Sequence, residues 1–338
     1  LHIQAPDGRG DWVATAEIIT PGWTATFRVD EWDCSRDWPF QVRWDGAGGD
    51  GVAVYSGRIR RDPVDSAEVV VAGFSCNDQA LRGVEGPNFP WNANGLWFPH
   101  NDVVRQVKVH DPDLLFFAGD QIYEGSSPTV AERGEWAKLD YLYKWYMWCW
   151  SFAELTCDRP SVVIPDDHDV YQGNLWGAGG RPTDKDDKGG YVMPAEFVKM
   201  VERTQTSNLP DPWDPTPVEQ GIGVYTCALE WGRVGFAILE DRKFKSGPDG
   251  LVPPTTSGRA DHVIDPDFDP QTADVPEAVL LGERQLRFLD DWIVDWKGQD
   301  MKVALSQTIF ANAATHHGPN MQYLVADYDS NGWPQAGR

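Results

Sequence analysis

Apolar and polar residues alternate through the first part of the chain. Apolar side chains occupy every second position in segments 23–29 and 40–44, with polar residues between them. A period of two is typical of β-strands that bury one face. We therefore expect residues 1–66 to form a small N-terminal β-sandwich domain of the immunoglobulin or fibronectin type.

After Glu68, short apolar runs alternate with helical periodicity. The expected elements are strands at 69–74, 114–118, 161–164, 224–229, 234–239 and 303–305 and helices at 102–110, 136–155 and 281–296. This order is typical of an α/β layer architecture. We expect residues 67–338 to form an α/β domain with a large sheet.

The two longest predicted helices differ in pattern. Helix 281–296 is amphipathic, and its inward face is expected to carry Leu286, Leu289, Ile293 and Trp296. Helix 136–155 has aromatic residues on every side. A sugar-binding or cofactor-stacking surface would have this composition, but burial between layers is the commoner reason, so we predict that this helix belongs to the core.

Composition narrows the class of protein. The chain has 338 residues, of which 41% are hydrophobic, and a net charge of −23. A chain of this length and hydrophobic content can bury a large core, which indicates a globular protein. Its negative charge disfavours binding to nucleic-acid phosphates and favours binding of cations. Apolar runs fall short of the roughly 20 residues that a membrane span needs. Five cysteines without a C-x-x-C pair argue against a disulfide framework and a zinc knuckle.

Two motif matches fail on their context. Segment 46–51 fits the dinucleotide pattern G-x-G-x-x-G, but a strand pattern follows it where a helix is required, so a hairpin loop is favoured. Asp residues at 265, 267 and 269 imitate the start of a calcium-binding EF-hand loop. Pro270 and Pro276 replace its obligatory glycine and closing glutamate, which excludes that kind of site.

Polar clusters follow directly after three of the predicted strands. Cys76 follows the first strand of the α/β region, Asp120 and Tyr123 follow the second, and Asp167 and His168 follow the third. Because ligands bind at the carboxyl ends of strands in α/β sheets, these side chains should converge on one edge. Their thiol, phenol and carboxylates suit a strongly Lewis-acidic ion such as ferric iron. Metal-assisted phosphoester hydrolysis is the predicted chemistry.

Each of these residues also has an ordinary structural explanation. Cys76 could be a small buried hydrophobe, Tyr123 a packing residue, and the acidic segment 166–169 a solvated turn. Crowded carboxylates are costly without a cation, which favours a metal. His168 would then be either a ligand or a proton donor to a leaving group, and Asn174 lies close enough in sequence to complete the wall of the site.

Seven short motifs occur in the order expected of the PhoD-like alkaline phosphatases, a branch of the calcineurin-like metallophosphoesterases. The chain resembles this family over nearly its whole length. The motifs are Phe74-Ser-Cys-Asn77, Gly119-Asp-Gln-Ile-Tyr-Glu124, Asp166-Asp-His-Asp-Val170, Leu239-Glu-Asp-Arg242, Leu281-Gly-Glu-Arg-Gln285, Ser306-Gln-Thr-Ile-Phe310 and Gly332-Trp-Pro334.

The resemblance implies a fold and a set of roles. The expected fold is an N-terminal β domain followed by a two-sheet α/β sandwich with helices on its faces, in a periplasmic or extracellular protein. Ferric iron and calcium are the expected ions, with Mn²⁺ or Zn²⁺ as substitutes. The implied metal ligands are Cys76, Asp120, Tyr123, Asn174 and Asp167, which replaces the family's usual asparagine.

The same resemblance gives two residues a part in the reaction. His168 corresponds to the family's proton donor or phosphate contact, and Arg242 is expected to steady substrate oxygens. The expected reaction is hydrolysis of phosphomonoesters or phosphodiesters, in which a metal-bound hydroxide attacks in line at phosphorus.

One feature departs from the family pattern. Family members continue past Gly-Trp-Pro to a Gly-Asp-x-His motif that supplies further metal ligands, whereas this sequence stops at Arg338. His316 and His317 do not fit that motif. We therefore expect a truncated form of a longer protein, weakly active or inactive, with segment 311–338 poorly packed.

Two other functions remain open at this point. One is a noncatalytic extracellular binding module, a Trp-rich β domain fused to a decayed hydrolase, which glycan binding without metal would favour. The other is an inverting glycosidase that uses Asp166 and Asp167 as its carboxylate pair. Adjacent positions in one turn do not give the separation that an inverting glycosidase requires.

Overall fold

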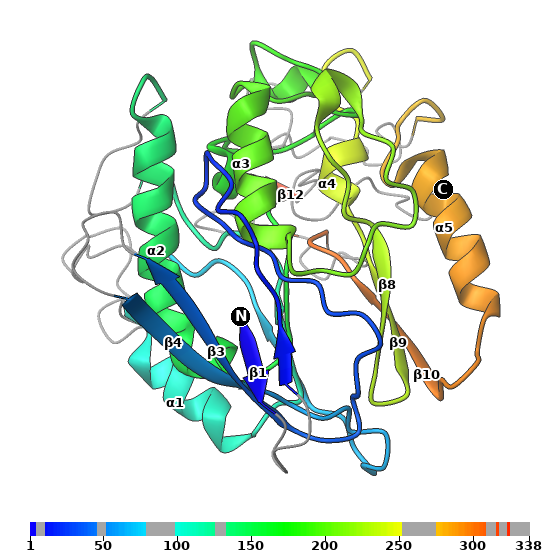
Figure 1. The fold of residues 1–338 in the computed structure, drawn as a ribbon. Coiled ribbons are helices and arrows are strands. Elements are labelled where there is room, and N and C mark those ends of the chain that lie inside the picture. The colour runs from blue at the N-terminus through cyan, green and yellow to red at the C-terminus, as the bar shows by residue number, and fades with distance from the viewer. Residues whose placement is uncertain are drawn as a thin grey trace.

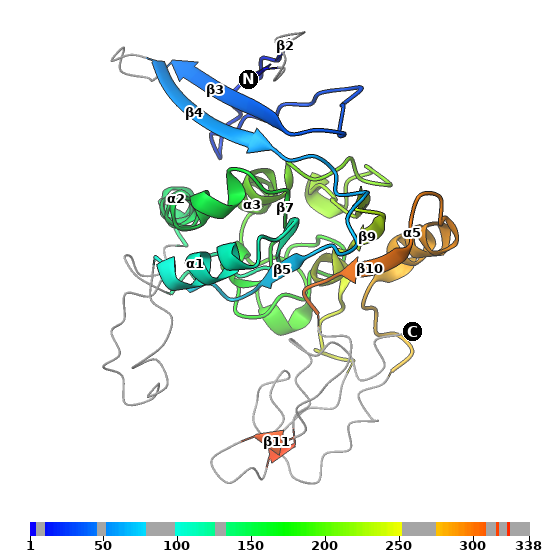
Figure 2. The same ribbon diagram turned by 90° about the horizontal axis from the view of Figure 1, so that it is seen from below.

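The computed structural model describes residues 1–4, 11–45, 52–78, 99–125, 133–251, 275–308, 316–317 and 323–324. An N-terminal antiparallel sheet lies to one side of an α/β region that contains two further sheets (Figures 1 and 2). Within the described residues, no helix is both long and apolar enough to span a membrane.

The N-terminal sheet has four strands in the order β2-β1-β3-β4. They are β1 (His2–Gln4), β2 (Asp11–Val13), β3 (Trp38–Asp45) and β4 (Val52–Ile59). Its small core is built on Trp38, against which the Trp12 ring packs edge-on at 4.6 Å. Strands β3 and β4 pair as far as Asp45 and Val52, as a hairpin requires, although the intervening segment 46–51 lies outside the described residues.

The strand expected at 23–29 does not form. The only pairing near it is an isolated bridge between Ile19 and Thr24 within the described residues. This segment packs instead against the end of α3 (Ala195–Thr206), where the Arg28 guanidinium donates to the Leu209 carbonyl at 2.9 Å. Its alternation does not mark one buried face, because Trp23 is 57% exposed while Val29 packs against the Trp38 cluster of the N-terminal sheet. The division of the chain at residue 66 stays a prediction.

The first α/β sheet is parallel, in the order β5-β6-β7. Its elements, in chain order, are β5 (Val71–Phe74), α1 (Asn101–Val109), β6 (Leu114–Phe117), α2 (Ala137–Thr156) and β7 (Ser161–Val163). All five agree with the elements expected from the sequence. The central strand β6 is an uninterrupted apolar run because helices cover one face and the second sheet covers the other.

The second sheet has the order β10-β9-β8, with β8 and β9 antiparallel and β9 and β10 parallel. Its elements are β8 (Cys227–Trp231), β9 (Val234–Ile238), α5 (Gly282–Val294) and β10 (Met301–Leu305). One hydrophobic cluster contains residues of both sheets, for example Leu114 and Phe236, so the sheets pack face to face. Periodicity predicted a large sheet, whereas the described residues of the α/β region form two three-stranded sheets that pack on each other.

The remaining elements are short. They are the 3₁₀ turns η2 (His168–Val170), η3 (Asp186–Lys188) and η4 (Glu219–Gly221), the helix α4 (Asp241–Phe244), and the strands β11 (His316–His317) and β12 (Tyr323–Leu324). The predictions for segments 252–274 and 325–338 fall outside the described residues.

Two helix faces differ from expectation. In α5 the buried residues are Gln285 and Phe288, whereas Leu286 and Ile293 are exposed. The Gln285 amide accepts from Glu240 N at 2.7 Å and donates to Leu281 O at 2.8 Å, and these buried bonds set the rotation of the helix. Helix α2 belongs to the core as predicted, but with one face only, and its other face is exposed.

Candidate metal centre

The loops that follow β6 and β7 meet at a glycine. Gly119 has φ of 97°, and a Cβ placed on it would lie 2.3 Å from the Asp166 Cβ, closer than any real contact. Only glycine allows both the left-handed conformation and this approach. The next residue, Asp120, also has a positive φ, of 54°, which aims its side chain toward the β7 loop.

Asp169 ties these two loops together. Its Oδ2 accepts hydrogen bonds from the backbone nitrogens of Asp120 and Asp166, each at 2.8 Å, and its Oδ1 accepts from the Gln205 amide at 3.0 Å. Asp169 is fully buried, and that burial raises its pKa to about 7. Its oxygens are occupied by these donors, so Asp169 positions the site and does not ligate.

The three side chains nearest to a metal-binding arrangement are Asp120, Asp167 and His168. One potential ligand atom from each lies within 4.8 Å of the other two. Among the described residues, Asp120 Oδ1 is buried without a hydrogen-bond partner. Burial, followed by the charges of Asp166 and Asp169, raises the Asp120 pKa to about 7. A bound cation would offset both the burial of the unpartnered Asp120 oxygen and the repulsion from the neighbouring carboxylates, so these residues fit a metal ion.

Cys76 and Tyr123 approach the same carboxylate. The Tyr123 hydroxyl donates to Asp120 Oδ2 at 2.8 Å, and the Cys76 thiol lies 3.7 Å from that oxygen. Burial raises the pKa of both the thiol and the phenol. The structure therefore brings together the three residues expected around iron, although Cys76 stands outside the tighter group of Asp120, Asp167 and His168. Their roles as ligands stay predictions.

His168 is oriented by a residue that the sequence did not single out. Its Nδ1 lies 2.7 Å from Glu124 Oε2, and its ring centroid lies 4.4 Å from that of Tyr123. Burial lowers the His168 pKa, but the hydrogen bond to Glu124 and the neighbouring carboxylates outweigh it and raise the pKa to about 10. Glu124 is the last residue of the motif that contains Asp120. Its position on the same loop as Asp120 is the sequence signal that could have identified it as a site residue.

The backbone of Glu124 is in turn held by a buried lysine. The Lys144 ammonium donates to the Glu124 carbonyl at 2.7 Å and pairs with Asp140 at 3.0 Å. The Tyr171 hydroxyl donates to the same Asp140 carboxylate at 2.7 Å. The histidine is thus supported by a chain of buried polar contacts that begins in α2.

Arg242 and Asn174 occupy different positions from the cluster. Arg242 is buried, and its Nε lies 2.6 Å from Asp166 Oδ1, so Asp166 fixes the guanidinium beside the β7 loop. Asn174 is half-buried after η2, and its backbone oxygen accepts from the Gln172 amide at 3.2 Å. Substrate binding by Arg242 and metal binding by Asn174 stay predictions.

Comparison with known proteins gives one match in structure. No protein-family model and no curated protein matches the chain by sequence. A solved structure described as that of PhoD matches with a TM-score of 0.56 and 15% identity, over 89% of this chain and 52% of that one. The chain has a PhoD-like fold. This agrees with the family resemblance found in the motifs, while the chain spans about half the length of the PhoD structure.

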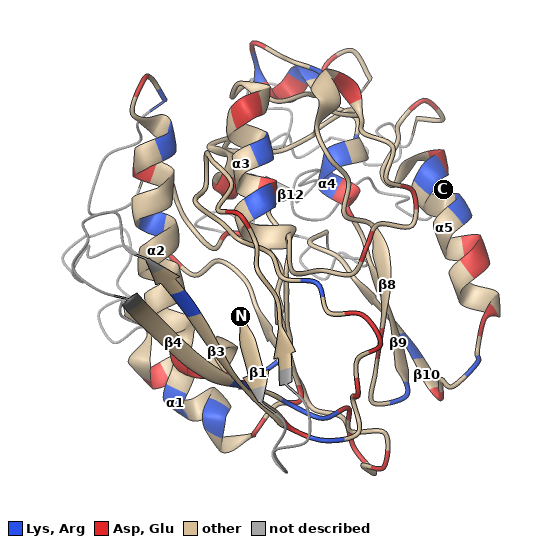
Figure 3. Cartoon of the chain, viewed as in Figure 1, with Lys and Arg blue, Asp and Glu red and all other residues tan. Residues whose placement is uncertain are grey.

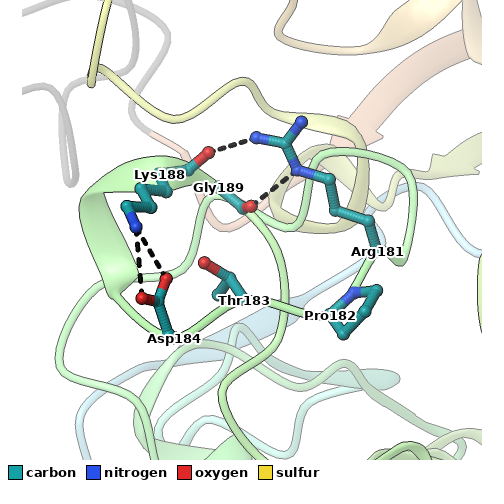
Figure 4. Close-up of a pocket in the computed structure, with 6 residues that line it drawn as sticks. All are labelled: Arg181, Pro182, Thr183, Asp184, Lys188 and Gly189. Carbon is teal, nitrogen blue, oxygen red and sulfur yellow. Dashed lines mark hydrogen bonds and ion pairs between the residues drawn. The ribbon is translucent and has the colours of Figure 1, made fainter.

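A pocket elsewhere in the PhoD-like fold is separate from this cluster (Figure 4). It has a volume of about 500 Å³, and its lining residues are Arg181, Pro182, Thr183, Asp184, Lys188 and Gly189. Arg181 donates to the Gly189 carbonyl at 2.8 Å, and Lys188 pairs with Asp184 at 2.9 Å. These cations hold their own loop together.

Proposed function

We propose that the protein is a metal-dependent phosphoesterase that hydrolyses phosphomonoesters or phosphodiesters. The observation that carries this proposal is the group of Asp120, Asp167 and His168 at the carboxyl ends of parallel strands, with a buried oxygen of Asp120 that lacks a partner among the described residues. The PhoD-like fold supports the reaction class by analogy.

The donor set suits more than one hard cation. Asp120, Asp167, Tyr123 and Cys76 would hold ferric iron, and the further carboxylate oxygens with Asn174 would hold calcium, with Mn²⁺ or Zn²⁺ as substitutes. When bound, such ions act as Lewis acids on phosphoryl oxygens and lower the pKa of water. The phenol and thiol, whose pKa values are raised by burial, would lose their protons on binding such an ion.

His168 supplies the proton for the leaving group. Glu124 contacts Nδ1, which leaves Nε2 to face the reacting ester. The hydrogen bond to Glu124 raises the pKa of His168 and so favours the doubly protonated ring, which can give a proton to the departing oxygen. Glu124 stabilises the charged ring before transfer, as the carboxylate does in other oriented histidines.

Arg242 binds the non-reacting phosphoryl oxygens in this proposal. Asp166 orients the guanidinium, whose planar fork of N–H donors is suited to phosphate. Because the chain is strongly acidic, this local cation and the metal ions must supply the attraction for an anionic substrate. We further propose, by analogy with the PhoD-like family alone, that the protein acts in the periplasm or outside the cell.

The test combines metal analysis with turnover. The purified protein is loaded with iron and calcium and assayed with p-nitrophenyl phosphate and bis(p-nitrophenyl) phosphate. We expect hydrolysis of at least one ester, lost in Asp120→Asn and kept in Asp184→Asn, which changes an exposed loop carboxylate. Full metal loading without turnover of either ester would contradict the proposal, and glycan binding without metal would favour the binding module.

A further inference from the structure

A stripe of exposed apolar residues runs along α2, beginning at the residue before its first turn. Its members and their exposed fractions are Trp136 60%, Leu139 58%, Tyr143 52%, Tyr146 53% and Trp150 66%. The intervals between them are three, four, three and four residues. This is the seven-residue repeat with which one helix packs lengthwise against another. We call these five residues the α2 stripe.

The α2 stripe is not needed for the core of the chain. The opposite face of the helix already supplies buried aromatic residues, among them Tyr141, Trp148 and Phe152. A surface helix normally carries polar residues on the face that points away from the core. In α2, that face is apolar from Trp136 to Trp150, a rise of about 21 Å at 1.5 Å per residue.

Charges are absent from the α2 stripe itself. The charged residues in this part of the helix are engaged elsewhere: Lys138 pairs with Glu196 at 2.8 Å, and Asp140 pairs with Lys144 in the interior. On the rest of the chain, acidic and basic residues are spread over most of the elements in view (Figure 3). An uncharged aromatic band of this length has the composition of the centre of a protein interface.

The stripe is also self-complementary. Tyr143 lies midway between Trp136 and Trp150, seven residues from each. If two α2 helices run antiparallel about a two-fold axis at Tyr143, each Trp136 meets the Trp150 of the other copy, and Leu139 meets Tyr146. We propose that two copies of this chain form a symmetric dimer through the α2 stripe, in this antiparallel arrangement.

The available area suits a reversible dimer. Aromatic side chains bury about 150–250 Å² each, so five residues that are more than half exposed offer roughly 500–600 Å² per copy. Two copies would bury about 1,000–1,200 Å², which is the lower end of specific interfaces. A net charge of −23 on each copy opposes association, but salt screens charges beyond about 8 Å at physiological ionic strength. Added salt should therefore strengthen the dimer.

Sedimentation velocity of the 338-residue protein over a concentration series, at low and high salt, tests the proposal. We expect a monomer–dimer equilibrium that shifts toward dimer as salt rises. Tyr143→Glu places two carboxylates across the axis and should raise the dissociation constant by at least about 100-fold. Val294→Glu is the matched control, because Val294 is 74% exposed on α5, at the opposite side of the molecule from α2 (Figure 1), and it should change nothing.

A second variant tests the geometry. In Tyr143→Cys the two new thiols would face each other, so oxidation by molecular oxygen with a copper catalyst should link two chains through one disulfide. Val294→Cys and the parent protein, which has exposed Cys34 and Cys76, measure the background. Far-UV circular dichroism checks that each variant is folded. A monomer at every concentration and salt, or a dimer that survives Tyr143→Glu, would overturn the proposal. A dimer without cross-linking in Tyr143→Cys would overturn the antiparallel arrangement.

Discussion

Two buried acidic clusters lie near strand ends in the two α/β sheets. They differ in whether a lysine of the chain neutralises the carboxylates. After β9, the carboxylates of Glu202 and Glu240 both contact the Lys243 ammonium, which also donates to the Gly223 carbonyl at 2.6 Å. After β6, Asp120 has no contact with a lysine or an arginine among the described residues.

The hydrogen bonds alone do not separate the two clusters. Glu240 Oε1 accepts from two backbone nitrogens and from the Thr226 hydroxyl, but Glu240 Oε2 and Asp120 Oδ1 are both buried without a hydrogen bond among the described residues. Of these two oxygens, Glu240 Oε2 contacts the Lys243 ammonium. The stronger sign of a metal is therefore a buried carboxylate oxygen with neither a hydrogen bond nor a lysine or arginine beside it. By that criterion the Glu240 cluster is structural and the Asp120 cluster is the candidate binding site.

Removal of the internal cation should produce the largest effect on stability. Lys243→Met leaves Glu202 and Glu240 buried without a counter-charge, so we expect a loss of about 3–5 kcal/mol in the free energy of unfolding. Lys188→Met is the control: its pair with Asp184 is exposed, and its loss should cost less than about 1 kcal/mol. Urea titration measures both. Equal small effects would show that the Glu240 cluster does not depend on its lysine.

Loss of the proposed proton donor should separate chemistry from metal binding. In His168→Ala we expect kcat to fall by roughly 10² or more while the metal content stays near that of the parent, because Asp120 and Asp167 remain. Steady-state kinetics and elemental analysis are compared on the same preparation. If the metal is lost together with activity, His168 is a ligand and the donor assignment is wrong.

A smaller effect is expected from the residue that orients this histidine. Glu124→Gln keeps the size of the side chain but removes the charge 2.7 Å from Nδ1, so we expect activity to fall by about 10-fold to 100-fold. The substitution should also lower the His168 pKa, which proton NMR of the ring can follow. An unchanged His168 pKa would mean that Asp167 and Asp120 supply most of its shift.

The sequence predicted which strands carry the site residues better than it predicted the hydrogen-bond partners of those residues. Apolar runs ending in Asp120 and in Asp167 place both residues at the carboxyl edge of a parallel sheet, and that edge is where the structure has them. No local pattern indicates that Asp169 accepts bonds from two loops, or that Glu124 meets His168 across 44 positions. Such contacts depend on the approach of distant segments, which periodicity does not record.

The same limit explains the errors in the fold. The sequence predicted the extent of helix α5 but not which of its faces is buried. The buried face carries Gln285, whose amide oxygen accepts a hydrogen bond from Glu240 N after β9, which a leucine could not do. Segment 23–29 alternates as a strand does, yet within the described residues it pairs only at Thr24, and its Arg28 guanidinium donates to the Leu209 carbonyl beyond α3. The apolar pattern records neither of these contacts with distant elements.

The metal content of three forms of the protein tests most directly whether the Asp120 cluster binds metal. Parent protein, Asp120→Asn and Glu202→Gln are loaded with iron and calcium, freed of excess ions and analysed for metal, with p-nitrophenyl ester turnover measured on each. We predict that the parent and Glu202→Gln retain metal and that Asp120→Asn loses it together with turnover, because Lys243 already neutralises Glu202 and Glu240, whereas Asp120 contacts no lysine or arginine among the described residues. Metal retained in Asp120→Asn, or absent from the parent, would contradict the account.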